Sequence, residues 1–204
     1  MTDDEKHQRT MNLNAHFAWA LALWGSAEVA REDGNPMLVP IGYYYSAFHS
    51  GFAFLNASPK VPLSALTRMV HTRLRDLLEG LLPFMRIQDL SLLREVRETI
   101  NYLGGGDPAH KLRIVRGHPF GFDINDKPYT YEQSLELASD VSKRFIFAVM
   151  DGLSSMNKLA VNRIPTRGDE AWLDEYLQED VLLGVIPRGA TGVRVLKKAF
   201  SFLD

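Results

Sequence analysis

The chain lacks several residue types on which common chemistries depend. Its 204 residues include no cysteine, which excludes disulfides, cysteine-ligated zinc and a cysteine nucleophile. The six histidines are scattered, and none has the four-residue helical spacing and acidic partner that a zinc-hydrolase helix requires. No Gly-x-Ser-x-Gly elbow is present. We therefore expect neither a metal nor any other cofactor.

The chain also has little net charge and no long apolar run. A formal net charge of -2 gives no overall basic field, so contact with RNA or DNA would need a local patch. Gly, Ser, His or charged residues interrupt every apolar run well before 18 residues, and the polar first nine residues are unlike a signal peptide. We expect a cytoplasmic protein that has no membrane span and one main domain.

The most regular apolar stretch, residues 41–55, predicts a central helix. One continuous stripe is formed at helical spacing by Tyr44, Phe48, Gly51, Phe52 and Leu55. Small residues between them allow neighbouring helix backbones to come close. Tyr45 and His49 lie outside this stripe, side by side on the helix surface, and are the first functional candidates. The alternative is that both are amphipathic residues with satisfied hydrogen bonds at the edge of a core.

Helical patterns on either side of this stretch predict a bundle. The first ten residues are expected to be mobile, before a helix capped by Asn12 or Asn14 that ends near residue 33. Asn35 and Pro36 offer a start for the central helix, which Pro40 could delay by a turn. Further helices are expected over residues 62–81, 88–103 and 130–156, the last beginning at a capping box formed by Thr130 and Gln133.

The remaining segments predict smaller additions to the bundle. Residues 112–115 favour a short strand and 118–128 a hairpin or turns, within an insertion that spans residues 104–130. A short helix is expected from Asp169, and residues 181–186 could pair with 193–196 as a hairpin. The predicted fold class is mainly α, an up-and-down bundle of about five helices over residues 1–160, with a C-terminal extension over 161–204.

A groove between the second and fourth predicted helices is the main candidate site. If these helices pack together, Tyr45 and His49 face three polar residues of the fourth helix, namely Arg94, Arg97 and Asn101. Such a groove could hold a phosphate, or bring an imidazole to a ribose hydroxyl. A polar seam or a dimer contact would explain the same residues.

A second polar strip lies on the predicted third helix. Arg68, His71 and Arg75 share the face opposite its aliphatic stripe. The strip is either a solvated face or a site for an anion or a partner.

Two segments together resemble the HEPN superfamily, and most closely its branch of small proteins associated with minimal nucleotidyltransferases. That branch shows a Tyr-Tyr-x-x-Phe-His element on its second helix, matched here from Tyr44 to His49, and an Arg-x-x-x-x-Tyr element on its fourth, matched by Arg97 and Tyr102. The resemblance covers roughly residues 10–105, with 130–160 fitting the remaining helix.

The resemblance implies a helical bundle that often dimerises, in toxin–antitoxin, phage-defence or RNA-processing systems. Many HEPN proteins are metal-independent ribonucleases that use an arginine and a histidine four to six residues apart near the fourth helix. Here no histidine follows Arg94 or Arg97 at that spacing. The expectation is a homodimeric, non-catalytic binding or regulatory subunit for RNA, a nucleotide or a protein partner such as a nucleotidyltransferase or a defence-complex subunit.

The residues expected at its ligand site are Tyr45, His49, Arg94, Arg97, Asn101 and Tyr102. One alternative is an endoribonuclease in which His49 and Arg97 replace the usual pair. Another is a purely structural module whose grooves are filled by its own C-terminal hairpin.

Overall fold

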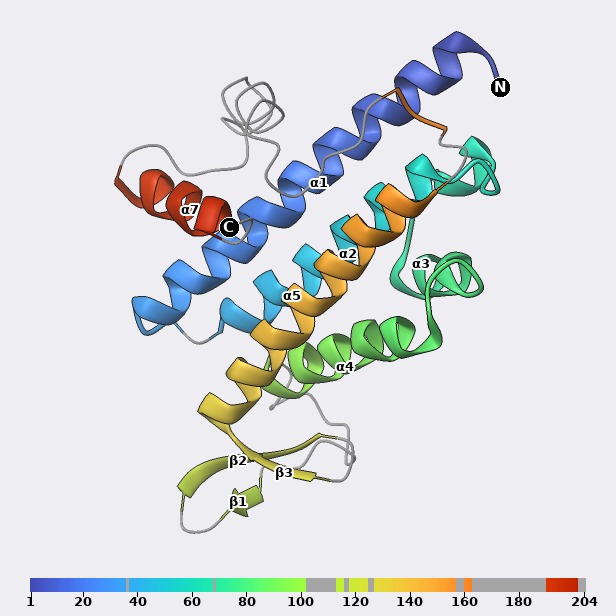
Figure 1. The fold of residues 1–204 in the computed structure, drawn as a ribbon. Helices are drawn as coiled ribbons and strands as arrows, with labels where there is room; N and C mark the ends of the chain where they lie inside the picture. Colours follow the sequence, from blue (N-terminus) through green and yellow to red (C-terminus); the bar gives the residue numbers. More distant parts are fainter. Residues whose placement is uncertain are drawn as a thin grey trace.

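The fold is built around α2 (Val39–Ala57), which contacts helices on several sides (Figure 1). The structure is a computed structural model that describes residues 1–35, 37–67, 69–101, 113–115, 118–124, 127–156, 160–162 and 190–201. The helical elements in chain order are α1 (Asp3–Glu32), α2, the 3-10 turn η1 (Leu63–Leu66), α3 (His71–Leu78), α4 (Phe84–Asn101), α5 (Tyr131–Ser155) and α7 (Ala190–Ser201). The predicted fold class, a mainly α helical bundle, is confirmed.

Small residues bring α1 and α2 into close antiparallel contact. The Ser46 hydroxyl donates a hydrogen bond of 2.6 Å to the Ala20 carbonyl. A Cβ placed on Gly42 would lie 2.7 Å from the Cβ of Ala27, so only glycine fits there. The predicted role of the small residues of the central helix is therefore confirmed, because they let the two backbones approach closely.

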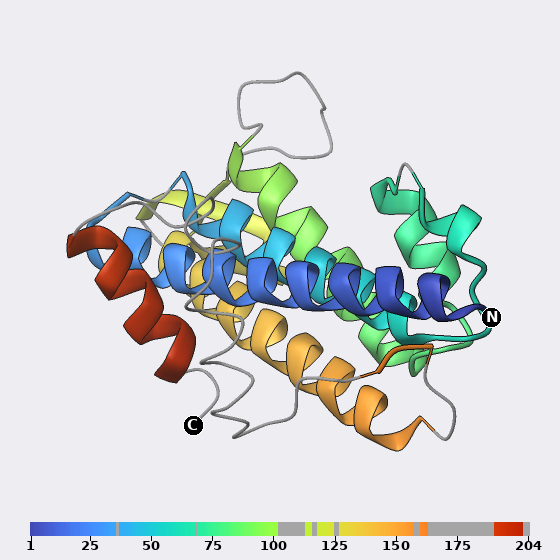
Figure 2. The ribbon, with the colours of Figure 1, turned by 90° about the horizontal axis from the view of Figure 1, so that it is seen from above.

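On its other side α2 packs against α5, and the two helices run in the same direction. The Ser142 hydroxyl in the middle of α5 donates to the Tyr43 carbonyl in the first half of α2, and further along both helices Gly152 lies against Phe54 near their ends. A strictly up-and-down order is thus wrong for α5. The reason is that α3, the crossing helix α4 and the sheet intervene in the chain and return it to the starting end (Figures 1 and 2).

The predicted capping box at the start of α5 is confirmed. Gln133 N–H donates to the Thr130 hydroxyl, and the Gln133 side chain accepts from the Thr130 N–H. The predicted inner face is buried, with relative exposures of 2% or less at Leu135, Ala138, Val141, Phe145 and Val149. Between α4 and α5, the carboxylate of Asp89 pairs with Arg144 at 2.9 Å.

A small antiparallel sheet precedes α5. Its strands β1 (Arg113–Val115), β2 (His118–Ile124) and β3 (Lys127–Thr130) are paired in the order β1-β2-β3. The predicted short strand and hairpin of the insertion are therefore confirmed. Thr130 both pairs with Gly121 as the last residue of β3 and caps α5, so the sheet passes into the helix without a loop.

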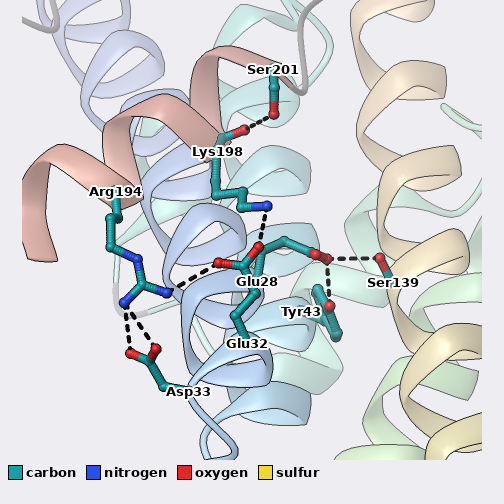
Figure 3. Close-up of polar contacts among 8 residues, drawn as sticks. All are labelled: Glu28, Glu32, Asp33, Tyr43, Ser139, Arg194, Lys198 and Ser201. Carbon is teal, nitrogen blue, oxygen red and sulfur yellow. Dashed lines mark hydrogen bonds and ion pairs between the residues drawn. The ribbon is translucent and has the colours of Figure 1, made fainter.

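Helix α7 lies across the outer face of α1 (Figure 3). Arg194 forms ion pairs with Glu32 and Asp33, and Lys198 pairs with Glu32. A Cβ on Gly25 would lie 2.5 Å from the Val195 carbonyl oxygen, so the two helices nearly touch at this glycine.

Two further polar groups hold α1 in place. Glu28 accepts hydrogen bonds from the Tyr43 hydroxyl at 2.5 Å and from the Ser139 hydroxyl at 3.0 Å, which links α1 to α2 and α5 (Figure 3). At the other end Arg9, whose side chain is only 2% exposed, donates to the carbonyls of Asn56 and Val61. Its guanidinium group thereby satisfies backbone acceptors where α2 ends.

Helix α1 starts a full nine residues before Asn12, which corrects the expected mobile start. Thr2 is the N-cap, and its hydroxyl accepts from the Glu5 N–H. The acidic residues Asp3, Asp4 and Glu5 in the first turn suit the positive end of the helix dipole. Helix α2 starts at Val39 with Pro40 in its first turn, so Pro40 does delay it.

The expected helix over residues 62–81 is wrong as a single element. The chain forms η1, then extended backbone at Thr67 and Val70, then the eight-residue α3. Leu66, Leu74 and Leu78 are still buried, because two short elements present the same apolar stripe to α2. Helix α4 begins at Phe84 rather than Gln88, directly after Pro83.

The expected hairpin between 181–186 and 193–196 is also wrong for its second arm. Residues 193–196 lie inside α7, where Gly192, Val195 and Ala199 are buried at helical spacing against α1. Residues 181–186 and the short helix expected from Asp169 lie outside the described residues. In the part of the chain that is described, no helix combines the length and apolar character needed to cross a bilayer.

Candidate functional site

A shallow pocket of about 170 Å³ lies where α2, α3 and α4 meet, and we call it the Arg94 pocket. Its lining residues are Tyr44 from α2, His71, Thr72 and Arg75 from α3, and Leu90, Ser91, Arg94, Glu95 and Glu98 from α4. Three helices thus contribute chemically active side chains to one small space.

Helical spacing explains why these residues converge. On α3, His71 and Arg75 are four residues apart and so lie on the same face. On α4, Ser91, Arg94 and Glu98 follow one another at intervals of three and four and form one stripe. The apolar stripes of both helices face the core, which directs these polar stripes toward the opening between them.

Tyr44 and His71 form the direct link between α2 and α3. The Tyr44 oxygen lies 2.6 Å from His71 Nδ1, and the two rings are 5.3 Å apart at their centroids. Tyr44 is only 1% exposed, so its hydroxyl requires a partner, which His71 supplies.

Arg97 lies beneath the pocket and packs on the aromatic rings of α2. Its guanidinium carbon is 4.5 Å from the Tyr44 ring centroid and 5.8 Å from that of Tyr45, both within the range of a cation–π interaction. The Arg97 side chain is 11% exposed, and its Nε atom is buried without a hydrogen-bond partner among the described residues. This cation is held by aromatic faces and by one carboxylate.

That carboxylate belongs to Glu98, which serves two arginines at once. The Glu98 Oε1 atom accepts from Arg94 Nε at 2.7 Å and from Arg97 Nη2 at 3.2 Å. One negative charge shared by two guanidinium groups leaves a positive charge in this triad. Arg75 is paired only loosely, at 3.5 Å from the exposed Asp76.

Burial and these cations set the protonation of the Tyr44–His71 link. Burial raises the pKa of Tyr44 to about 12, although Arg97 and Arg94 act in the opposite direction. Burial, together with the charges of Arg97 and Arg94, lowers the pKa of His71 below its ordinary value. At neutral pH both groups are therefore uncharged. The hydrogen bond leaves His71 Nε2 as an N–H donor in one tautomer and as a free base in the other.

Among the sequence-predicted site residues, Tyr45, Arg94 and Arg97 lie at this pocket or beside it. Tyr45 is half-buried, with its ring 5.2 Å from Tyr44 and 5.8 Å from His71. Asn101 is the last residue of α4, and its side chain lies outside the described part. Tyr102 is also outside the described residues.

His49 lies in a different cluster, against α1. Its Nδ1 atom is 2.8 Å from Nδ1 of His16, and its ring stacks with Trp19 at 5.8 Å and 15°. Burial lowers the pKa of His49 to about 4, and burial together with the charge of His49 lowers the pKa of His16 to about 4. The described contacts do not join His49 to Arg97, since the latter packs on Tyr44 and Tyr45.

The two residues at the centre of the pocket, Tyr44 and His71, are absent from the groove that the sequence predicts. Tyr44 reads as part of the apolar stripe, and it is indeed buried, but its hydroxyl reaches the pocket. His71 and Arg75 belong to the polar strip for which a site for an anion was one interpretation. The sequence signal that could have identified them is a histidine and an arginine four residues apart, His71 and Arg75, in a segment that is followed by a helix carrying further arginines.

No metal site is formed by the described residues, where no group of three or more His, Asp or Glu side chains could hold an ion. Comparison with known proteins gives no family for the chain, because no family model, no curated protein and no solved structure matches it.

Proposed function

We propose that the chain is a HEPN-like helical protein that binds a phosphate-bearing ligand, RNA or a nucleotide, in the Arg94 pocket. The observation that carries this proposal is that Arg75, Arg94 and His71, from two helices, line one pocket in which His71 also contacts the Tyr44 hydroxyl. Guanidinium groups match the geometry of phosphate oxygens, and a neutral imidazole adds a donor without requiring a charge. The pocket is lined by Arg75, Arg94, Glu95 and Glu98, and with Arg97, which pairs with Glu98, one net positive charge is left to favour an anion at this position.

The proposed role is that of a non-catalytic binding or regulatory subunit. The fourth helix lacks the usual Arg/His pair, while the resemblance points to the branch that accompanies minimal nucleotidyltransferases. The proposal therefore includes a cytoplasmic homodimer with a nucleotidyltransferase or a defence-complex subunit as partner. Its setting would be toxin–antitoxin, phage-defence or RNA-processing.

Two arginines on α3 provide a matched test of the pocket. Arg75 lines it, whereas the exposed Arg73 on the same helix does not. Binding of short RNA, of nucleotides and of inorganic phosphate is measured by titration calorimetry for the wild type and for Arg75→Met, Arg94→Met and Arg73→Met. We expect the first two variants to lose about tenfold or more in affinity, as for a charge-assisted hydrogen bond of roughly 1.5–3 kcal/mol, and Arg73→Met to bind like the wild type. No binding of any of these probes, or equal losses in all three variants, would contradict the proposal.

A second candidate function is a metal-independent endoribonuclease in which His71, rather than His49, transfers the proton. The observation that favours it is the 2.6 Å contact between a neutral imidazole and the Tyr44 hydroxyl, next to Arg94. The free-base Nε2 could accept a proton from a ribose 2′-hydroxyl, while Arg94 stabilises charge on the phosphate.

This candidate is tested by incubating labelled single-stranded RNA with the protein in the presence of EDTA. Cleavage that His71→Asn abolishes and His49→Asn preserves would support it. If the wild type leaves the RNA intact while binding it at the Arg94 pocket, the non-catalytic role remains and the ribonuclease is excluded.

A further inference from the structure

A second cavity, of about 480 Å³, lies at the end of the bundle where α2 and α5 finish side by side (Figure 1). We call it the end pocket. Its walls include Phe54 and Ser58 from the end of α2, Leu81 from the turn between α3 and α4, and Gly152 and Met156 from the end of α5. A volume of this size falls within the range of small-molecule sites, and it is separate from the Arg94 pocket.

Two glycines shape the end pocket. A Cβ on Gly152 would lie 2.8 Å from the Phe54 ring, so the glycine lets that ring approach the backbone of α5 closely. Gly80 has a φ of +78°, a conformation that lets the chain turn sharply after α3 and place Leu81 in the wall. The apolar side chains in the described walls are those of Phe54, Pro59, Leu81 and Met156.

The described polar side chains at the end pocket are those of Ser58, Lys60 and Ser155, and the Ser155 hydroxyl is already engaged because it donates to the Gly152 carbonyl. Lys60 is exposed and forms no ion pair with any described residue. Ser58 is only 2% exposed, and its hydroxyl has no hydrogen-bond partner in the described part of the chain. An ammonium group without an ion pair and a hydroxyl without a hydrogen-bond partner among the described residues, both in the lining of the cavity, are features of a site that orients a ligand by one polar end.

Three helices end near this cavity, and helix C-termini would by themselves favour a cation. Several carbonyl groups at these helix ends are, however, already engaged. Arg9 donates to the Asn56 carbonyl of α2, while the Leu78 carbonyl of α3 accepts from Leu81 N–H, and the Leu153 carbonyl of α5 from Met156 N–H. Among the described residues that line the pocket, Lys60 carries the only charged side chain.

We propose that the end pocket binds a small ligand with an apolar body and one carboxylate group. The body packs against Phe54, Leu81 and Met156, while the carboxylate pairs with Lys60 and accepts a hydrogen bond from Ser58. This site is independent of the function proposed for the Arg94 pocket.

The test uses the full chain with decanoate as the probe and decanol as its uncharged counterpart. The calorimetric titration with decanoate should reach saturation. The affinity for decanol should be about threefold lower, as expected from the loss of one partly exposed ion pair. Lys60→Glu should weaken decanoate by a similar factor and leave decanol unchanged, whereas Lys197→Glu on the exposed face of α7 should change neither.

A second pair of variants tests the location without altering charge. Ser155 lines the end pocket and Ser154, also exposed, does not. Ser155→Trp should fill the cavity and lower the affinity for decanoate at least tenfold, while Ser154→Trp should bind like the wild type. The proposal is overturned if decanoate does not saturate, if decanol binds as tightly as decanoate, or if the two tryptophan variants bind equally. Should Ser155→Trp fail to fold, the Lys60→Glu result decides alone.

Discussion

Arg97 connects the Arg94 pocket to the core of the bundle. Its guanidinium group packs on Tyr44 and shares the Glu98 carboxylate with Arg94. Its charge also contributes to lowering the pKa of His71. A residue of this kind influences a site without lining it. Its replacement should therefore change both the stability of the fold and the titration of the pocket histidine.

Replacing Arg97 with Met keeps the apolar stem but removes the charge. Because Arg97 lowers the pKa of His71, we expect that pKa to rise toward its ordinary value, as measured by NMR titration of the imidazole. The free energy of unfolding should fall by about 1–2 kcal/mol with the cation–π interaction. Arg73→Met is the control, and an unchanged His71 titration in the Arg97 variant would show that this cation does not act on the imidazole.

Arg9 has a structural role that can be measured separately. In Arg9→Met the carbonyls of Asn56 and Val61 lose their donor inside the protein, which should lower the free energy of unfolding by about 3 kcal/mol. Urea unfolding measures this loss. Lys6→Met, one turn earlier on α1, should change it by less than about 0.5 kcal/mol. Equal effects of the two variants would mean that water replaces the guanidinium group at little cost.

For single residues, the sequence predicts which side chains belong to the candidate site better than it predicts which side chains contact one another. Arg94 and Arg97 were identified because they recur on a helix with the right spacing. The contact between Tyr44 and His71 joins residues that are 27 positions apart, and it depends on the turn that ends η1 and begins α3. No local pattern specifies that turn, so His71 could only be placed on a polar strip of unknown direction.

In the described part of the chain, α7 is held against α1 by a close approach at Gly25, by buried Val195 and Ala199, and by ion pairs of Arg194 and Lys198. An alanine in place of Gly25 would normally favour a helix by about 1 kcal/mol, but here its Cβ would meet the Val195 carbonyl at 2.5 Å. The ion pairs of Arg194 and Lys198 are exposed and hold the helix only weakly.

We therefore expect Gly25→Ala to detach α7 while α1 stays folded. Hydrogen exchange followed by mass spectrometry should show faster exchange for residues 190–201 and unchanged protection in α1. Ser26→Ala provides the control, because the Ser26 hydroxyl bonds only to the Ala22 carbonyl of its own helix. Slow exchange of residues 190–201 in Gly25→Ala would show that the two helices can separate slightly without losing contact.

The element that shows both a helix-capping motif and an apolar face in the sequence was predicted well. The elements that show only an apolar pattern were not. Helix α5 has both a capping box and an apolar face, and its start is correct to the residue. The stripe over residues 62–81 has the spacing of a helix, yet an apolar stripe fits two short elements equally well when both lie on α2. Helix α7 was missed because Val193 and Val195 suggest a strand, whereas burial follows the spacing of Val195 and Ala199.

For the molecule as a whole, the histidine pair between α1 and α2 makes stability depend on pH. His16 and His49 have pKa values of about 4 in the folded protein, below the ordinary value of 6.5. Between these values the unfolded chain binds more protons than the folded one, so stability is complete above pH 6.5 and falls as the pH decreases toward 4.

This prediction is tested by thermal unfolding at several pH values from 7.5 to 4.5. The double variant His16→Phe/His49→Phe keeps an aromatic ring at both positions but removes the two titrating imidazoles. Its melting temperature should therefore fall less on acidification than that of the wild type. His7→Asn, at an exposed position of α1, should behave like the wild type. Parallel curves for the wild type and the double variant would show that carboxylates alone cause the acid sensitivity.

At the same scale, a helical bundle could be predicted because composition and apolar periodicity agree over most of its length. The direction of α5 could not be predicted, because it depends on how α4 crosses α2 and on the sheet that follows. These arrangements are set by contacts such as the one between Asp89 and Arg144, which are distant in the chain.

Thr130 is shared by the sheet and by α5, and it leaves no hinge between them. A force that tilts the sheet must either break the capping box or turn the 25-residue helix with it, over a length of about 37 Å. The sheet and α5 therefore move as one body. A molecule that binds the sheet and tilts it would also displace the far end of α5.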